Sequence, residues 1–341
     1  MRVTRETLIR IAKETAQERM YNNPDLIAAY LTGSLLTEKP FLGGVTDIDL
    51  VFVHAQIPAK RREIIKLHGD FHIDVTYRAR KEYDPPRELR NNPWLGYEIY
   101  DPMLIKEKKL FFDYVQAAVR AGFEFHDPVY ILTRCRHLLN HGRQIWLELW
   151  EEEPDPVGPN ELARYLKSVH HILNTIAEFS GPPLSERRVL LDFPARAEAI
   201  ERPGFSAGLI GLLGGSRLDQ ETLKGWLADW QKDFLAAAEV PAVDKRIHNA
   251  RLAYYLNAFE EILEGETPTA VLWPLLRTWT LAAQVLPNSE RSKWQEACMQ
   301  LDLLGKGFDT RLEGLDHMID DIEEILDKKS KENGLNEEEA F

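Results

Sequence analysis

Hydrophobic positions in the first third of the chain alternate between helical spacing and short runs typical of strands. Leu8, Ile11 and Ala12 recur on one helix face, with Thr4 in the N-cap position, which predicts a helix over about 4–20. Apolar runs between turn residues predict four strands, at Leu26–Leu31, Ile48–Val53, Phe71–Tyr77 and Tyr97–Tyr100. Further helices are predicted over Ala59–Leu67 and 108–121. This alternation indicates an α+β domain with a small mixed β-sheet and flanking helices.

From about residue 126 the pattern becomes purely helical. The apolar residues from Leu162 to Ile176 step by four, three, four and three, and those from Phe308 to Leu326 keep the same rhythm. Other helical stretches are predicted around 129–150, 220–239, 244–264 and 268–285. We therefore expect an α+β domain over 1–125, an all-α helical bundle over 126–327, and a mobile charged tail over 328–341.

Composition narrows the class of protein. The 341 residues are 44% hydrophobic and 28% charged, and the net charge of −13 argues against a nucleic-acid partner. Two cysteines, Cys135 and Cys298, are too few for a disulfide framework. Charged residues interrupt the N-terminal segment, and no apolar run approaches the roughly 18 residues of a membrane span. We expect a cytoplasmic protein without a signal peptide or a membrane contact.

Three aspartates lie at the start of one predicted strand and within another, in a pattern that indicates a metal site. Asp47 and Asp49 flank Ile48, so strand alternation places both on one face, roughly 6.6–7 Å apart along the chain. Asp74 lies at the equivalent face of the next apolar strand and completes a cluster of three if the two strands are neighbours. Carboxylate oxygens select hard cations, and Mg²⁺ is the first candidate.

Gly33 and Ser34 end the strand before this carboxylate pair. A glycine allows the backbone to approach a phosphate closely, and a serine hydroxyl with nearby N–H groups can bind phosphate oxygens. Together with three carboxylates and Mg²⁺, these residues suit phosphoryl-type transfer, in which positioning and electrostatics supply most of the rate.

The series Gly33-Ser34, Asp47-Ile48-Asp49 and Asp74 resembles, in order and spacing, the signature of the nucleotidyltransferase superfamily typified by DNA polymerase beta. The resemblance covers about residues 27–105. It implies that a nucleoside monophosphate passes from a nucleoside triphosphate, with ATP as the default, to an acceptor, and that pyrophosphate is released. It also implies that Asp47 and Asp49 bind both metal ions. Asp74 would bind the catalytic metal and take the acceptor's proton, and Ser34 would contact the triphosphate.

A compact nucleotidyltransferase domain followed by a helical domain also resembles the aminoglycoside and lincosamide nucleotidyltransferases. This resemblance implies a small hydroxyl-bearing acceptor, such as an aminoglycoside-like antibiotic, in a cleft that the helical domain helps to form. The negative net charge of the protein would attract a cationic acceptor. Lys167 and Arg188 of the helical domain are expected to bind the triphosphate together with Gly33 and Ser34. Glu98 is the alternative general base to Asp74.

Two other functions stay open at this stage. One is the same chemistry with a protein or a tRNA end as the acceptor, as in a toxin–antitoxin system, although the net charge argues against RNA. The other is a non-catalytic nucleotide-binding regulator, which would bind nucleotide in the presence of magnesium without turnover. The oligomeric state is also open.

Overall fold

The computed structural model describes residues 3–123 and 128–335. Within them the chain forms two compact units. We call residues 3–123 with 250–258 the sheet unit, and residues 128–249 with 259–335 the helical unit. The segment 250–258, which the sequence pattern assigned to the helical domain, thus clusters with the sheet unit, and α9 (Leu252–Glu264) is divided between the two.

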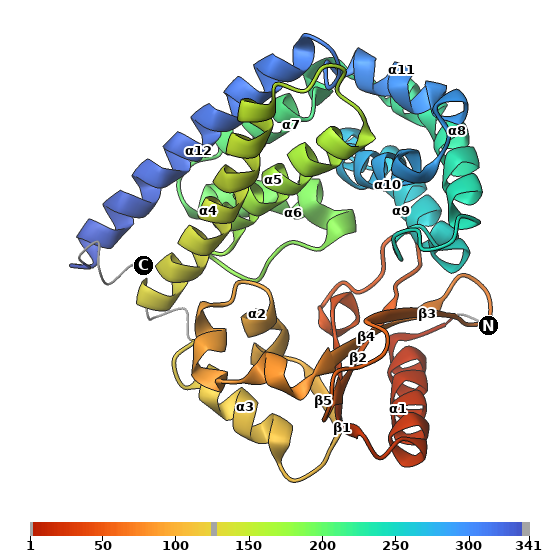
Figure 1. Ribbon diagram of the computed structural model, residues 1–341, viewed down its shortest axis with the longest axis vertical. Coiled ribbons are helices and arrows are strands. Elements are labelled where there is room, and N and C mark those ends of the chain that lie inside the picture. The colour runs from red at the N-terminus through yellow and green to blue at the C-terminus, as the bar shows by residue number, and fades with distance from the viewer. Residues whose placement is uncertain (1–2, 124–127, 336–341) are drawn as a thin grey trace. The chain divides into compact units, whose positions relative to one another are not determined.

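The sheet unit contains a mixed five-stranded sheet in the order β3-β4-β2-β1-β5 (Figure 1). Its strands are β1 (Leu26–Thr32), β2 (Ile48–His54), β3 (Arg62–Lys66), β4 (His72–Ala79) and β5 (Met103–Glu107). Strands β2 and β4 are parallel, and the other neighbours are antiparallel. The predicted α+β class, with a small mixed sheet followed by helices, is confirmed.

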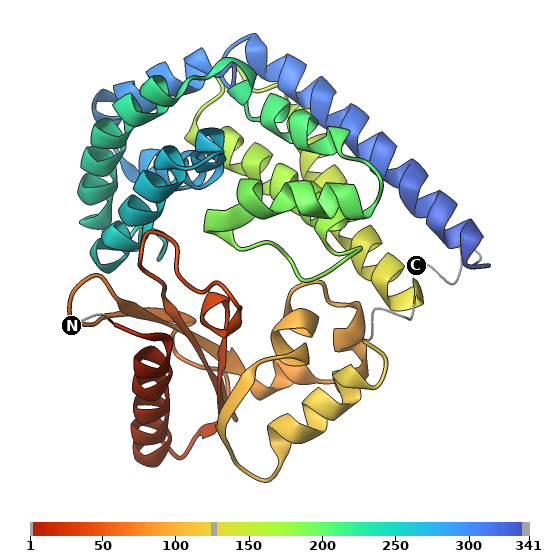
Figure 2. The same ribbon diagram turned by 180° about the vertical axis from the view of Figure 1, so that it is seen from behind.

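Helices cover both faces of this sheet (Figures 1 and 2). On one face, α1 (Arg5–Asn22) buries Leu8 and Ala12 in a core with strand residues such as Leu50. The backbone N–H of Thr7 donates to the Thr4 hydroxyl at 3.3 Å, which confirms the predicted N-cap. On the other face, α2 (Leu95–Tyr100) and α3 (Phe111–Arg120) form a second core with β1 and β2.

Two predicted elements of the sheet unit are wrong. The segment predicted as a helix over Ala59–Leu67 contains edge strand β3, which pairs antiparallel with β4. Its neighbouring β-branched residues Ile64 and Ile65 suit a half-buried strand, and pairing decides the outcome for so short a run.

The predicted strand Tyr97–Tyr100 lies instead in helix α2. The side-chain oxygen of Asn92 accepts hydrogen bonds from the backbone N–H groups of Trp94 and Leu95, at 3.0 and 2.8 Å, and forms a turn that leads into this helix. A four-residue apolar run does not by itself distinguish a strand from a buried helix turn. The last strand, β5, lies beyond the four that were predicted, after Pro102.

Every strand of the described residues belongs to the sheet unit, and the helical unit is built from helices. Besides the later part of α9, these are α4 (Pro128–Glu152), α5 (Pro159–Ala177), α6 (Val189–Ala199), α7 (Gly204–Leu212), α8 (Gln220–Ala238), α10 (Leu272–Val285), α11 (Ser292–Gln300) and α12 (Gly307–Glu332). Helix α4 lies beside α5 and α12 (Figure 2). The periodic residues that predicted α5, from Leu162 to Ile176, are all buried.

Two helix ends of this unit differ from the sequence prediction. Helix α9 begins at Leu252 rather than 244, because Asp244 accepts the backbone N–H of Arg246 at 2.9 Å and so favours a turn. Helix α12 continues past Lys328 to Glu332, and Ser330 is buried, so the predicted tail begins as helix. The rest of the predicted tail, from 336 onward, lies outside the described residues. No helix among the described residues is long and apolar enough to cross a membrane.

Candidate functional site

Three aspartates meet at one end of the sheet. In the parallel pair β2 and β4, Asp49 is the direct partner of Asp74, and Asp47 immediately precedes β2. One carboxylate oxygen from each of Asp47, Asp49 and Asp74 lies within 4.8 Å of the others. Asp47 and Asp74 are buried and Asp49 is half-buried. The convergence that strand alternation predicted is therefore present in the structure.

Gly33 lies directly against this cluster. Its backbone angles, φ 79° and ψ −164°, fall in a region that essentially only glycine adopts. A Cβ at this position would stand 1.9 Å from the Asp49 Oδ2 atom. Ser34 begins the short 3₁₀ helix η1 (Ser34–Leu36), and its Oγ lies 2.9 Å from the Thr46 hydroxyl. Of the predicted glycine-serine pair, Gly33 thus packs against Asp49, and Ser34 contacts Thr46, the residue before Asp47.

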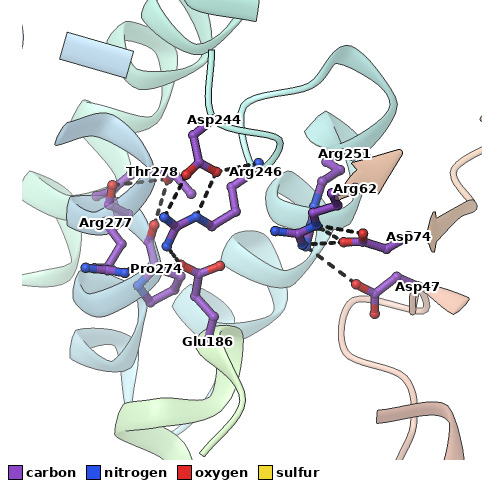
Figure 3. A network of polar contacts seen from close by, with 11 residues as sticks. Asp47, Arg62, Asp74, Glu186, Asp244, Arg246, Arg251, Pro274, Arg277 and Thr278 are labelled. Atoms are coloured by element: carbon purple, nitrogen blue, oxygen red, sulfur yellow. Dashed lines mark hydrogen bonds and ion pairs between the residues drawn. The ribbon is translucent and has the colours of Figure 1, made fainter. Parts of the chain in front are cut away.

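Two arginines converge on the same carboxylates (Figure 3). The Arg62 Nε donates to Asp74 Oδ1 at 2.7 Å, and its Nη2 donates to Asp74 Oδ2. The Arg251 Nη1 donates to Asp74 Oδ2 at 2.6 Å, and its Nη2 lies 3.5 Å from Asp47 Oδ2. Both oxygens of Asp74 therefore accept from guanidinium groups.

The loop before β2 packs against the segment that carries Arg251. A Cβ on Gly43, whose φ is +65°, would stand 2.1 Å from the backbone oxygen of Asn257, so this loop touches the segment 250–258 directly. The guanidinium carbon of Arg251 lies 5.1 and 5.6 Å from the ring centroids of Tyr254 and Tyr255. Arg251 is therefore buried, with 4% of its surface exposed.

These contacts shift the acid–base properties of the cluster. Burial, and then the charges of Asp47 and Asp74, raise the pKa of Asp49 well above its ordinary value. Burial alone would raise the pKa of Asp74 as well, but the hydrogen bonds from Arg62 and the charge of Arg251 lower it. A divalent cation beside Asp49 would reverse the rise in its pKa, because an opposite charge favours the carboxylate form.

The donor set fits a hard divalent cation. Asp47, Asp49 and Asp74 offer only carboxylate oxygens, which are the ligands that Mg²⁺ prefers. Each carboxylate oxygen carries two lone pairs: Asp74 Oδ2 accepts two hydrogen bonds, from Arg62 and Arg251, whereas Oδ1 accepts one from Arg62 and can still take a further ligand. The arginines are instead electrostatic competitors of such a cation, because they bring positive charge to the same oxygens.

Three other predicted residues come from other elements. Lys167 is exposed on α5, and Arg188 is half-buried at the end of the 3₁₀ helix η4 (Glu186–Arg188). Both belong to the helical unit, and their contact with a triphosphate stays a prediction. Glu98 accepts hydrogen bonds from the Tyr30 hydroxyl at 2.5 Å and from Arg78 Nε at 2.9 Å.

Glu98 lies away from the aspartates for a simple reason of strand geometry. Its partner Arg78 is on the same face of β4 as Asp74 but four residues further along, which corresponds to about 13 Å. The Glu98 carboxylate is also committed to an ion pair with that arginine. This arrangement supports a structural role for Glu98 and leaves Asp74 as the candidate base.

The sequence pattern singled out neither Arg62 nor Arg251. Arg62 could have been found if residues 62–66 had been recognised as a strand, since alternation then places it on the Asp74 face. Its Cα partner across the strand pair is Thr76, and Asp74 is the diagonal neighbour. Arg251 is 177 residues from Asp74 in the chain, and no local pattern points to it.

A separate cavity of about 670 Å³ lies within the sheet unit, among residues of α1, the edge strand β3 and β4. It is lined by Arg19, Glu63 and Tyr77, whose side chains bond to one another, and by apolar residues such as Ile65 and Ile73. Because Ile73 and Asp74 are consecutive strand residues, the cavity and the aspartates face opposite sides of the sheet.

Comparisons with known proteins leave the family open. No family model and no curated protein matches the sequence. Among solved structures, the chain is similar to a nucleotidyltransferase-like protein from Exiguobacterium sibiricum, with 11% identity over 92% of this chain and 90% of the other, at a TM-score of 0.27. That score is too low to support a fold or a function, so the function is inferred from the geometry of the aspartate cluster.

Proposed function

We propose that this protein is a Mg²⁺-dependent nucleotidyltransferase. It moves a nucleoside monophosphate, AMP from ATP in the simplest case, to a hydroxyl of a small molecule such as an aminoglycoside-like antibiotic, and releases pyrophosphate. The observation that carries the proposal is the convergence of Asp47, Asp49 and Asp74 beside Gly33. Three carboxylates so close together repel one another, and a shared divalent cation relieves that repulsion.

The proposed roles follow from the chemistry of each group. Asp47, Asp49 and Asp74 hold the metal, and Mg²⁺, when bound, supplies positive charge that stabilises the triphosphate and the departing pyrophosphate. Gly33 allows close approach of a phosphate, and the Ser34 hydroxyl donates to its oxygens. The acceptor oxygen forms a bond to the α-phosphorus as the bond to the pyrophosphate oxygen breaks.

Asp74 takes the proton of the acceptor hydroxyl in this scheme. Its pKa is lowered by Arg62 and Arg251, which makes it a weak base while those contacts persist. Release of an arginine contact raises the basicity of Asp74 and so favours proton transfer.

A screen with labelled nucleoside triphosphates and a panel of hydroxyl-bearing acceptors tests the proposal. With Mg²⁺ present, mass spectrometry should detect an acceptor that has gained a nucleoside monophosphate, with an equal amount of pyrophosphate. Asp49→Asn keeps the shape of the side chain but removes its charge, and we expect it to slow transfer by about 100-fold or more. Transfer at an unchanged rate in this variant would refute the assigned role of the cluster.

The arginine contacts favour a second candidate, a non-catalytic nucleotide-binding regulator. Arg62 and Arg251 already supply positive charge to Asp74, so the cluster is partly neutralised by the protein itself. This candidate predicts that nucleotide binds in the presence of Mg²⁺. It also predicts that pyrophosphate is never released, whichever acceptor is added, whether a small molecule, a protein or a tRNA. Pyrophosphate release with any acceptor excludes it.

A further inference from the structure

Arg62 and Arg251 hold Asp74 in different ways. The Arg251 side chain is 5% exposed, packed beside Tyr254 and Tyr255, and bonded to Asp74 and Asp47. The Arg62 side chain is 35% exposed and comes from edge strand β3. Of the two, Arg62 is the one that solvent and a ligand can reach, whereas Arg251 is enclosed by the protein.

The register of β3 on β4 aims Arg62 at Asp74. Arg62 pairs with Thr76 and Ile64 pairs with Asp74, so Arg62 is the diagonal neighbour of Asp74 on the same face of the sheet. Its guanidinium reaches both carboxylate oxygens as a two-pronged contact, Nε to Oδ1 and Nη2 to Oδ2. This geometry is the one in which arginine binds carboxylates and phosphates most specifically.

A guanidinium in this position opposes a metal ion on the same carboxylate. Both carry positive charge, and they would repel each other across a few ångströms in a partly buried site. A triphosphate removes the conflict, because its oxygens offer the guanidinium an alternative two-pronged partner of greater negative charge. Binding of a nucleotide therefore favours release of Arg62 from Asp74.

We propose that Arg62 is a gate for the metal. It holds Asp74 in the nucleotide-free protein and transfers to the triphosphate oxygens when nucleotide binds, so that metal and nucleotide bind together. Arg251 remains as a fixed counter-charge. This inference rests on the proposed function, and it assigns to Arg62 a contact with the triphosphate that the sequence pattern assigned to Lys167 and Arg188.

The proposal has a thermodynamic signature. Nucleotide must strengthen metal binding, and by reciprocity metal must strengthen nucleotide binding, while the metal alone binds weakly. Removal of the Arg62 charge should change the two affinities in opposite directions. Metal alone should bind more tightly, because its competitor is gone, and nucleotide should bind more weakly, because a ligand of the triphosphate is gone.

Binding of Mn²⁺ alone, followed by the electron paramagnetic resonance signal of free Mn²⁺, measures the first effect. We expect Arg62→Gln to bind Mn²⁺ at least tenfold more tightly than the unmodified protein. In a calorimetric titration with a non-hydrolysable ATP analogue and Mg²⁺, we expect the same variant to bind nucleotide at least tenfold more weakly. Arg61→Gln is the matched control, because Arg61 is an exposed neighbour that pairs with Glu82, and it should change neither value.

The outcomes separate the gate from the proposed function. Mn²⁺ affinity in Arg62→Gln at or below that of the unmodified protein overturns the gate, and so does an equal effect of Arg61→Gln. If the unmodified protein and Arg62→Gln both bind Mn²⁺ and Asp49→Asn does not, the metal site is supported even if the gate proposal fails. If none of the three binds Mn²⁺, the metal site and the proposed function fail together.

A second variant, Arg62→Lys, tests the gate if Arg62→Gln does not fold. Arg62→Lys retains the charge but loses the two-pronged contact, so Mn²⁺ should bind with an affinity between those of the unmodified protein and Arg62→Gln. Circular dichroism establishes that each variant is folded before titration. Mn²⁺ affinity in Arg62→Lys that equals or falls below that of the unmodified protein contradicts the gate.

Discussion

Replacement of Gly33 by alanine tests how closely the backbone and the carboxylates are packed. The new Cβ would stand 1.9 Å from Asp49 Oδ2, whereas ordinary van der Waals contact begins at 3.4 Å. The Asp49 carboxylate must therefore move by about 1.5 Å, the difference between these two distances, or the backbone must shift by as much. A misplacement of about 1 Å at a reacting centre can cost about 100-fold in rate.

The backbone conformation adds a separate cost in stability. Gly33 has φ 79° and ψ −164°, and a residue with a side chain is strained there by about 1–3 kcal/mol. Gly44→Ala is the matched control: its φ is +68°, and a Cβ added there would meet no atom within 4 Å. Both variants should lose free energy of unfolding through backbone strain, but only Gly33→Ala should disturb Asp49.

Urea denaturation, Mn²⁺ titration and the transfer assay separate these effects. For Gly33→Ala we expect a stability loss of about 1–3 kcal/mol, weaker Mn²⁺ binding and about 100-fold slower transfer. For Gly44→Ala we expect a comparable stability loss with Mn²⁺ binding and transfer unchanged. If folded Gly33→Ala binds Mn²⁺ and transfers as well as Gly44→Ala does, the argument that Gly33 positions Asp49 is wrong.

Three further predictions concern the pH dependence of stability, the coupled binding of nucleotide and metal, and the identity of the general base. Burial raises the pKa of Glu63, but hydrogen bonds from Arg19 and Tyr77 outweigh it and lower the pKa from 4.5 to about 2. The unfolded chain therefore takes up this proton first, and stability should fall between about pH 4.5 and 2, by about 1–2 kcal/mol after allowance for solvent screening. Glu63→Gln should lack this part of the loss in urea titrations at pH 6 and pH 3, and an identical loss in the variant counts against it. ATP with Mg²⁺ should raise the melting temperature more than either alone, because both bind the folded state, and a merely additive shift argues against coupled binding. Glu98→Gln should lower the free energy of unfolding by about 1–3 kcal/mol yet keep the transfer rate, whereas Asp74→Asn should abolish transfer; the reverse pattern would make Glu98 the base.

The aspartate cluster was predictable because its geometry is local. Asp47 and Asp49 share a face through strand alternation alone, and Asp74 needed only the pairing of two apolar strands. Gly33 was identified as a backbone position of close approach, and the structure adds that the atom it approaches is Asp49 Oδ2.

The electrostatic partners of the cluster were not predictable for equally physical reasons. Arg62 lies on an edge strand of five residues whose propensity is too weak to identify it without its partner strand. Arg251 reaches Asp74 from a segment of the chain that local periodicity assigns to helices, and this contact between residues far apart in the chain depends on tertiary packing. Similarly, the turn before helix α2 depends on hydrogen bonds to one side-chain oxygen of Asn92, which leave no periodic signal in the sequence.

A crystal structure with Mn²⁺ and a non-hydrolysable nucleoside triphosphate analogue would show whether the three aspartates bind a metal ion beside a nucleotide. We expect an anomalous manganese peak bonded to carboxylate oxygens of Asp47 and Asp49, with the triphosphate beside Gly33 and Ser34. Nucleotide bound at another place, or manganese absent from these carboxylates while the nucleotide is bound, would contradict the proposed function.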